Sequence, residues 1–138
     1  MNISTLLFFA GVGQIILVLG SLAIPRILHW KQELAKVEPL IQQIFWTYAG
    51  YILVTNFSFG IISVFAGEVL TDGSTLATAV TGFITLYWFS RIIIQFFYFE
   101  RKNFPKGTIH NIGEVLLVAL FVYLIIVYGY AFYLNILK

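Results

Sequence analysis

The chain has no cysteine and few charged side chains. Among 138 residues there are eight Lys and Arg, six Asp and Glu, and no Cys. Without Cys there can be no disulfide, no thiolate nucleophile and no Cys-ligated metal, which excludes thiol-based membrane oxidoreductases. The net charge of +2 is too small to indicate a nucleic-acid partner. We therefore expect no nucleic acid and no cofactor.

The usual catalytic motifs are also missing. There is no HExxH pair, no P-loop lysine motif, no GxSxG elbow and no pair of acids within an apolar stretch. Gly11-Val12-Gly13 lies inside an apolar run with no strand before it, so it does not indicate a nucleotide loop. His29, His110 and Glu114 lie in or beside separate polar connections, and no metal site is predicted from them.

Hydrophobic side chains are abundant instead, at 60% of the chain, with 18% aromatic. Too little polar surface remains to cover a water-soluble core, so the solvent of this protein is the bilayer. Crossing about 30 Å of hydrocarbon takes roughly 20 apolar residues in a helix. The sequence predicts an all-α polytopic membrane protein, with a single four-helix transmembrane domain over residues 1–138. The four predicted spans are about 3–24, 40–66, 76–99 and 112–137.

Charge in the connections predicts the orientation. The connections 25–39 and 100–111 carry basic side chains, whereas the turn between the second and third spans carries two acids and no base. Because cytoplasmic loops are rich in Lys and Arg, both basic connections are expected in the cytoplasm and both termini outside. The residues are Arg26, Lys31 and Lys36 in the first connection, Arg101, Lys102 and Lys106 in the second, and Glu68 and Asp72 in the turn. A cleaved signal peptide is the alternative for the first segment, and its removal would reverse this charge arrangement.

Aromatic residues are placed as membrane-interface anchors would be. Trp30 and Trp46 are expected near one interface, and Tyr128, Tyr130 and Tyr133 near the other. The connection 25–39 mixes apolar and charged residues, which favours a short amphipathic helix on the membrane surface.

Small residues at helical spacing predict the faces on which helices meet, since close backbone approach drives association in lipid. The first span has the weakest of these seams, and the second and third have clearer ones. The seam residues are Ala10, Gly13 and Gly20 in the first span, Ala49, Asn56, Gly60, Ser63 and Gly67 in the second, and Ser74, Thr78, Gly82 and Thr85 in the third.

Arg91 is the main candidate for function, because an ionisable residue within a span is costly and is therefore a functional candidate by default. Tyr87, Gln95 and Tyr98 share its helical face, nearly opposite the Gly82 seam. Counting residues from the cytoplasmic helix ends puts Gln14, Tyr48 and Tyr51 at a similar depth. These seven residues are the predicted ligand-binding site, a polar and aromatic cavity for a lipid headgroup, a quinone or another amphipathic molecule.

Two structural alternatives stay open at this point. Arg91 can instead bend toward the headgroups, or be neutralised by Glu114 or Glu100, and serve only to fix helix register. Asn56, near the middle of its span, is expected to form an interhelical hydrogen bond.

The stretch from Tyr87 to Tyr98, followed by Glu100 and His110, resembles small four-helix bacterial membrane proteins that have no known function. The chain is also similar to the membrane-associated proteins of eicosanoid and glutathione metabolism (MAPEG). The similarity lies in the chain length, the number of helices, the outward termini and an arginine in the third helix that is followed by an aromatic residue. That resemblance implies a homotrimer using glutathione, and it carries over only to Arg91 and Tyr98. In the second span the chain departs from it, with Gln42, Gln43, Thr47 and Tyr51 where the family has Arg, Asn and Glu.

These observations favour a non-catalytic integral membrane protein, either a subunit of an assembly or a lipid-binding accessory. An enzyme acting on an amphipathic substrate near Arg91 is the alternative, and an oligomeric transporter or channel is the third. Expected partners are membrane lipids and either further copies of the chain or other membrane subunits. The expected location is the bacterial inner membrane.

Overall fold

The computed structural model describes residues 2–98 and 107–138 and is all-α. Four long helices carry the fold, and no strand occurs among the described residues. The elements are α1 (Ile3–Ser21), α2 (Ile24–Ile27), α3 (Trp30–Leu34), α4 (Pro39–Phe65), the 3-10 turn η1 (Val69–Thr71), α5 (Thr75–Ile93), the π-helix η2 (Ile94–Tyr98) and α6 (Thr108–Leu137).

The helix boundaries follow from local sequence signals. Asn2 caps α1 by accepting a hydrogen bond from the Thr5 N–H (2.9 Å), and Ser74 caps α5 by accepting one from Ala77 (3.0 Å). Pro39 occupies the first turn of α4, where its missing N–H has no consequence. The four apolar stretches run from 24 to 30 residues, long enough to cross a bilayer, so the protein is membrane-embedded as predicted.

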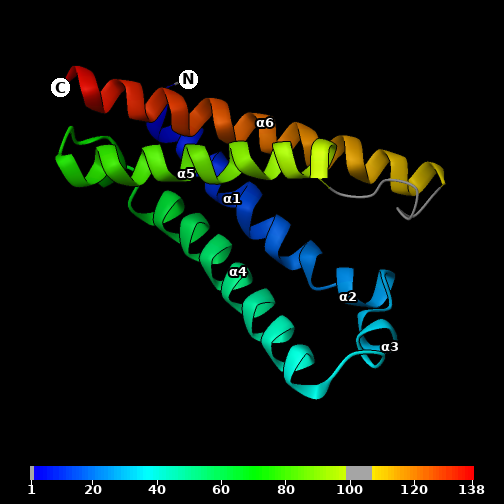
Figure 1. The fold of residues 1–138 in the computed structure, drawn as a ribbon. Coiled ribbons are helices and arrows are strands. Elements are labelled where there is room, and N and C mark those ends of the chain that lie inside the picture. The colour runs from blue at the N-terminus through cyan, green and yellow to red at the C-terminus, as the bar shows by residue number, and fades with distance from the viewer. Residues whose placement is uncertain (1, 99–106) are drawn as a thin grey trace.

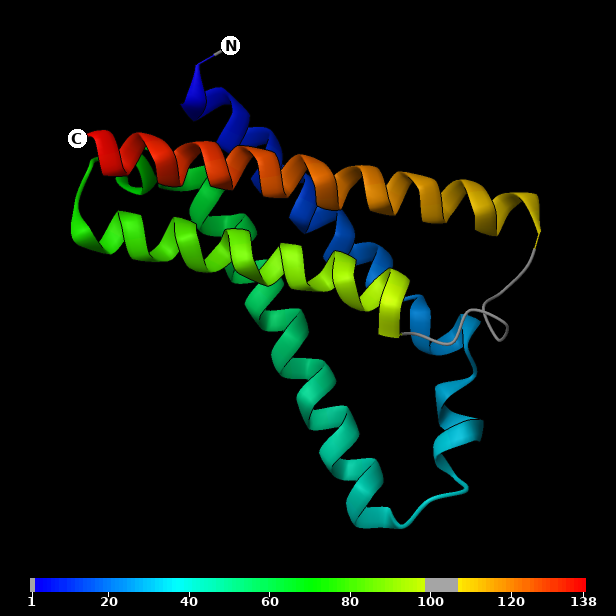
Figure 2. The ribbon, with the colours of Figure 1, turned by 45° about the horizontal axis from the view of Figure 1, so that its top comes forward.

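The four long helices form two antiparallel pairs, α1 with α4 and α5 with α6, and α1 also touches α6. Figures 1 and 2 show α5 and α6 side by side while α4 runs away from them. The start of α1, the end of α6 and the turn 66–74 share one end, which we call the acidic end. The opposite end, with α2, α3 and the start of α4, is called the basic end. Most of the connection 100–111 lies outside the described residues.

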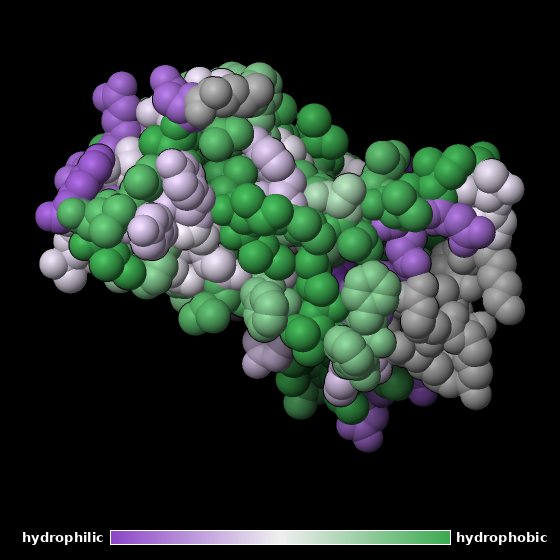
Figure 3. All heavy atoms as spheres, turned by 90° about the horizontal axis from the view of Figure 1, so that it is seen from above, coloured by the Kyte–Doolittle hydropathy of each residue, from purple (hydrophilic) through white to green (hydrophobic). Residues whose placement is uncertain are grey.

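The surface follows the same division. Hydrophobic side chains cover most of the face in Figure 3, and hydrophilic side chains gather toward its ends. The segment 25–39, predicted as one amphipathic helix, instead forms the short helices α2 and α3. His29, between them, has a left-handed backbone (φ 55°), which interrupts the helix. Trp30 packs edge-on against Phe45 and Trp46 of α4, with ring centres 4.9 and 5.8 Å apart.

Two glycines bring α1 and α4 into backbone contact. A Cβ on Gly11 would lie 2.6 Å from the Gly60 carbonyl oxygen, closer than real Cβ atoms come. Asn56 and Ser63 are buried beside Gly60, which confirms that part of the predicted α4 seam. In the predicted α1 seam, Ala10 is fully buried and a Cβ on Gly13 would meet Leu120 of α6, but Gly11 makes the crossing with α4 and nothing lies within 4 Å of Gly20.

Beyond this crossing, α4 separates from the other long helices. Its buried residues are Asn56, Gly60 and Ser63, all in the half nearer the acidic end. In the half nearer the basic end, Tyr48 and Tyr51 are each more than 60% exposed. The short helix α3 contacts this part of α4 through Trp30, but the other long helices leave it exposed, so the bundle is closed at the acidic end and splayed at the basic end.

Candidate functional site

Arg91 lies near the basic end of α5 and is linked to α6 through one glutamine. Its Nη1 donates a hydrogen bond to Gln95 Oε1 (3.0 Å), and Gln95 Nε2 donates one to Glu114 Oε2 (3.2 Å). The Gln95 amide therefore lies between a cation on its own helix and an anion on the neighbouring one. We call these three residues the Arg91 cluster.

The backbone changes form at this cluster. Gln95 lies in the π-helix Ile94–Tyr98, and its side chain is only 4% exposed. Short π-helical turns within α-helices are rare and occur frequently at functional sites. Arg91 and Gln95 are four residues apart and so meet on one face of the helix.

Two aromatic rings pack beneath the Arg91 guanidinium, on the side toward the acidic end. The Arg91 Cζ lies 5.2 Å from the centre of the Phe121 ring of α6, within the range of a cation–π interaction. Phe121 in turn stacks on Trp88, with ring centres 5.3 Å apart and 23° between the planes. Both rings are buried, so the position of Arg91 is set by a rigid aromatic pair.

Below the rings, a hydrogen-bond network joins all four long helices. Trp88 Nε1 donates to Gln14 Oε1 (3.1 Å), and Gln14 Nε2 donates to the Tyr128 hydroxyl (2.6 Å) and to the Ala10 carbonyl (3.2 Å). The Tyr128 hydroxyl is also hydrogen-bonded to Ser63. We call Gln14, Ser63, Trp88 and Tyr128 the central network.

Gln14 therefore belongs to the interior rather than to a ligand cavity. It is fully buried, and its amide oxygen and nitrogen are both hydrogen-bonded. It is joined to Arg91 only indirectly, through Trp88 and Phe121. Tyr128, expected at a membrane interface, is fully buried too, because its hydroxyl meets partners from α1 and α4; Tyr130 and Tyr133 are exposed.

Tyr87 connects α5 to α4. Its hydroxyl donates to Asn56 Oδ1 (2.5 Å), and its ring packs edge-on against Phe59 at 5.2 Å. The interhelical hydrogen bond expected of Asn56 is thus present. Arg91 follows Tyr87 by one helical turn, on the side where α4 separates from the bundle.

Three predicted site residues lie apart from the Arg91 cluster on the surface. Tyr48 and Tyr51 of α4 are 62% and 66% exposed, and Tyr98 is 81% exposed. Counting depth along each helix assumed helices that stay together over their whole length. Because α4 diverges, equal depth does not make its tyrosines neighbours of Arg91.

The sequence did not predict the two aromatic rings that lie beneath Arg91. Phe121 and Trp88 were not predicted to support Arg91, because a single sequence does not show which face of α6 meets α5. Glu114 was considered as a residue that neutralises Arg91 and as a metal-ligand candidate beside the histidines, and the intervening role of Gln95 was not foreseen. Within the described ranges, no three His, Asp or Glu side chains are grouped so as to hold a metal ion.

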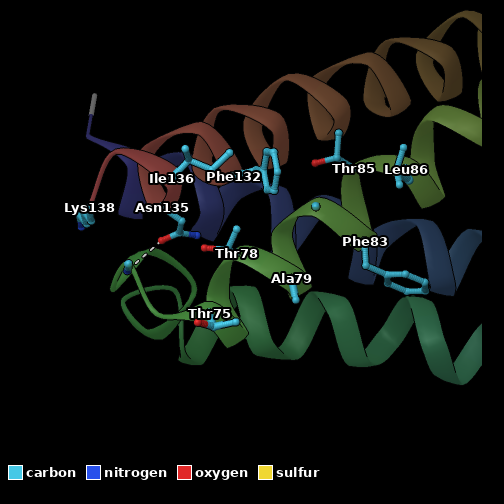
Figure 4. A pocket seen from close by; sticks show the side chains of 12 residues that line it. Thr75, Thr78, Ala79, Phe83, Thr85, Leu86, Phe132, Asn135, Ile136 and Lys138 are labelled. Carbon is cyan, nitrogen blue, oxygen red and sulfur yellow. Dashed lines mark hydrogen bonds between the residues drawn. The ribbon is translucent and has the colours of Figure 1, made fainter.

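Two hollows lie at the acidic end, away from Arg91. The larger, about 990 Å³, runs between α5 and α6 past Thr78, Gly82 and Phe132 (Figure 4). The Thr78 hydroxyl donates back to its own helix, and Asn135 accepts from Gly73 N (3.0 Å) and donates to the Leu70 carbonyl (2.7 Å). The smaller, about 400 Å³, lies beside residues 63–69. Neither hollow contains a predicted site residue.

Comparison with known proteins gives no relative. No family model, curated protein or solved structure matches this chain. Its function has to be argued from its own residues.

Proposed function

We propose that this protein is a non-catalytic membrane accessory that binds the phosphate of a phospholipid headgroup at Arg91. The observation that carries the proposal is the Arg91 cluster itself. It holds a guanidinium within a membrane span, against the buried ring of Phe121 and beside a π-helical turn. A guanidinium is planar and permanently charged, and its N–H groups match phosphate oxygens in pairs.

The depth of Arg91 supports a headgroup as the ligand. It lies seven residues from Tyr98, the end of the described π-helix, or about 10 Å at 1.5 Å per residue. A long basic side chain at that depth reaches toward the headgroup layer. Basic pockets between transmembrane helices on the cytoplasmic side are typical lipid-headgroup sites.

The splayed basic end supports access from the bilayer. Tyr87 of α5 is hydrogen-bonded to Asn56 of α4, and nearer the basic end most α4 side chains are exposed. A lipid can approach between α4 and α5 without displacing a packed helix of the described chain.

The proposal includes an orientation and a location. Following the positive-inside rule, we place the basic end in the cytoplasm, so the bound lipid belongs to the cytoplasmic leaflet. We place the protein in the bacterial inner membrane, as the resemblance to small bacterial membrane proteins implies.

The test is native mass spectrometry of the full chain released from mild detergent. The wild type is expected to retain phospholipid, and Arg91→Gln to lose it while keeping its helical circular dichroism. Arg26→Gln is the matched control, because Arg26 is a basic residue at the same end but outside the cluster. Equal lipid retention by Arg91→Gln and the wild type would overturn the proposal.

A further inference from the structure

The Arg91 cluster holds two opposite charges rather than one. Arg91 on α5 and Glu114 on α6 hydrogen-bond to the two ends of the same Gln95 amide. Since Gln95 is 4% exposed and bonded at both ends, its side chain is fixed and so is the spacing of the charges. A site for phosphate alone would gain nothing from a carboxylate, because the carboxylate repels an anion.

We propose that this cluster selects a zwitterionic phospholipid whose headgroup ends in a primary ammonium. The inference rests on the proposed function and names the ligand of that same site. The phosphate is bound by Arg91 and the ammonium by Glu114. A primary ammonium donates three hydrogen bonds and can pair closely with a carboxylate, whereas a quaternary ammonium has no N–H to donate.

The order of the two charges along the membrane normal fits such a headgroup. Gln95 follows Arg91 by one turn toward the basic end, and Glu114 is bonded to the Gln95 amide nitrogen. The Arg91 guanidinium lies 5.2 Å from the centre of the ring of Phe121, which is about two turns deeper in α6 than Glu114, so the carboxylate is the charge nearer the membrane surface at the basic end. In a phospholipid the phosphate is bonded to the glycerol that carries the acyl chains and the amine lies at the far end of the headgroup, which is the same order.

A headgroup with an anion and no amine fits less well. A glycerol headgroup would bind Arg91 and meet repulsion from Glu114. The choline headgroup has the right net charge but cannot donate to the carboxylate. The cluster should therefore bind ethanolamine-type lipids more tightly than lipids with a glycerol or a choline headgroup.

The experiment is a lipid titration of delipidated full-length protein followed by native mass spectrometry. The probes are phosphatidylethanolamine, its N,N-dimethyl derivative, phosphatidylcholine and phosphatidylglycerol with identical acyl chains. Binding is expected to weaken at each methylation step, and the loss of the charge-assisted bond makes choline about tenfold weaker. Glu114→Gln should remove the preference for ethanolamine over choline, while Glu33→Gln, an exposed acid at the same end, should keep it.

Each outcome separates this inference from the function on which it rests. If Arg91→Gln abolishes phospholipid binding but the wild type binds all four lipids equally, the selectivity is wrong and the proposed function stands. If the wild type retains no phospholipid, both fail. If Glu114→Gln misfolds, the series of methylated lipids bound to the wild type still tests the selectivity for a primary ammonium. Glycerophosphoethanolamine, the same headgroup without acyl chains, should not displace the lipid at equal concentration. Displacement would show that the site binds the free headgroup and not specifically the lipid, which would overturn the lipid as the ligand.

Discussion

Gln14 on α1 donates a 2.6 Å hydrogen bond to the hydroxyl of Tyr128 on α6, 114 residues further along the chain. Both side chains are fully buried at the level where all four long helices meet. The same amide accepts from Trp88 of α5, and Tyr128 is hydrogen-bonded to Ser63 of α4. One glutamine thus links α1, in one helix pair, to both α5 and α6 of the other pair.

Replacing Gln14 with Leu should therefore weaken the whole bundle. The change leaves the Trp88 N–H without its acceptor and Tyr128 without its donor, which should lower the free energy of unfolding by about 1 to 2 kcal/mol. The measurement is unfolding in mixed micelles followed by circular dichroism. Ser58→Ala removes an exposed hydroxyl bonded only to its own helix, and should change little. A Gln14→Leu variant as stable as the wild type would show that the central network is not a stabilising link.

Gly11→Ala should force α1 and α4 apart. The new Cβ would lie 2.6 Å from the Gly60 carbonyl oxygen, and a backbone atom cannot move aside as a flexible side chain can. We expect a loss of about 1 to 3 kcal/mol, the range typical of overpacking.

Gly20→Ala is the matched control, because nothing lies within 4 Å of that position in the same helix. It should be neutral or slightly stabilising, since Ala favours the helix more than Gly does. Thermal unfolding of the two variants in one detergent compares them directly. Because the Gly11–Gly60 contact lies within one chain, Gly11→Ala should change stability more than oligomer size; a change of oligomer size alone would contradict this.

The turn at the acidic end should lose order in acid. The Ser74 hydroxyl and backbone N–H, followed by the Lys138 ammonium, hold the pKa of Asp72 below its ordinary value. A carboxyl whose pKa is lower in the folded state stabilises fully above its unfolded pKa and loses that effect as pH falls through the folded pKa. The contribution should therefore be present at neutral pH and disappear below the ordinary Asp range.

The measurement is an NMR titration of the Asp72 carboxyl and the Ser74 amide, which is 2.8 Å from the carboxylate. Asp72→Asn should abolish the acid-dependent shift of the Ser74 amide, and Glu68→Gln should leave it intact. An unchanged shift in Asp72→Asn would assign the transition to another group.

Single cysteines test the proposed orientation, because the native chain has none. A Cys in place of Glu68 should react with an impermeant maleimide added outside intact cells, and a Cys in place of Lys36 should react only after the cells are opened. Both positions are exposed, so lack of labelling reports sidedness rather than burial. The reverse pattern would place the Arg91 cluster in the outer leaflet.

The fold class and the four spans could be predicted because they depend on local properties. An apolar run of sufficient length, bounded by Pro39 or capped by Ser74, is a helix in lipid whatever its neighbours are. The burial of Asn56, Gly60 and Ser63 was predictable for a related reason, since small and polar residues at helical spacing mark close contact. Arg91 could be singled out from the cost of a charge within a span.

What the sequence by itself determined, then, is that the chain is all-α and membrane-embedded, and that Arg91 and Gln95 share a helical face. Only the tertiary structure decided that α4 diverges and leaves Tyr48 and Tyr51 exposed, that Gln14 and Tyr128 meet in the core, and that Phe121 lies beneath Arg91. The physical reason is that periodicity specifies which residues share a face of one helix. Which faces of different helices meet depends on crossing points such as Gly11 and Gly60, where a steric fit between distant parts of the chain sets the angle.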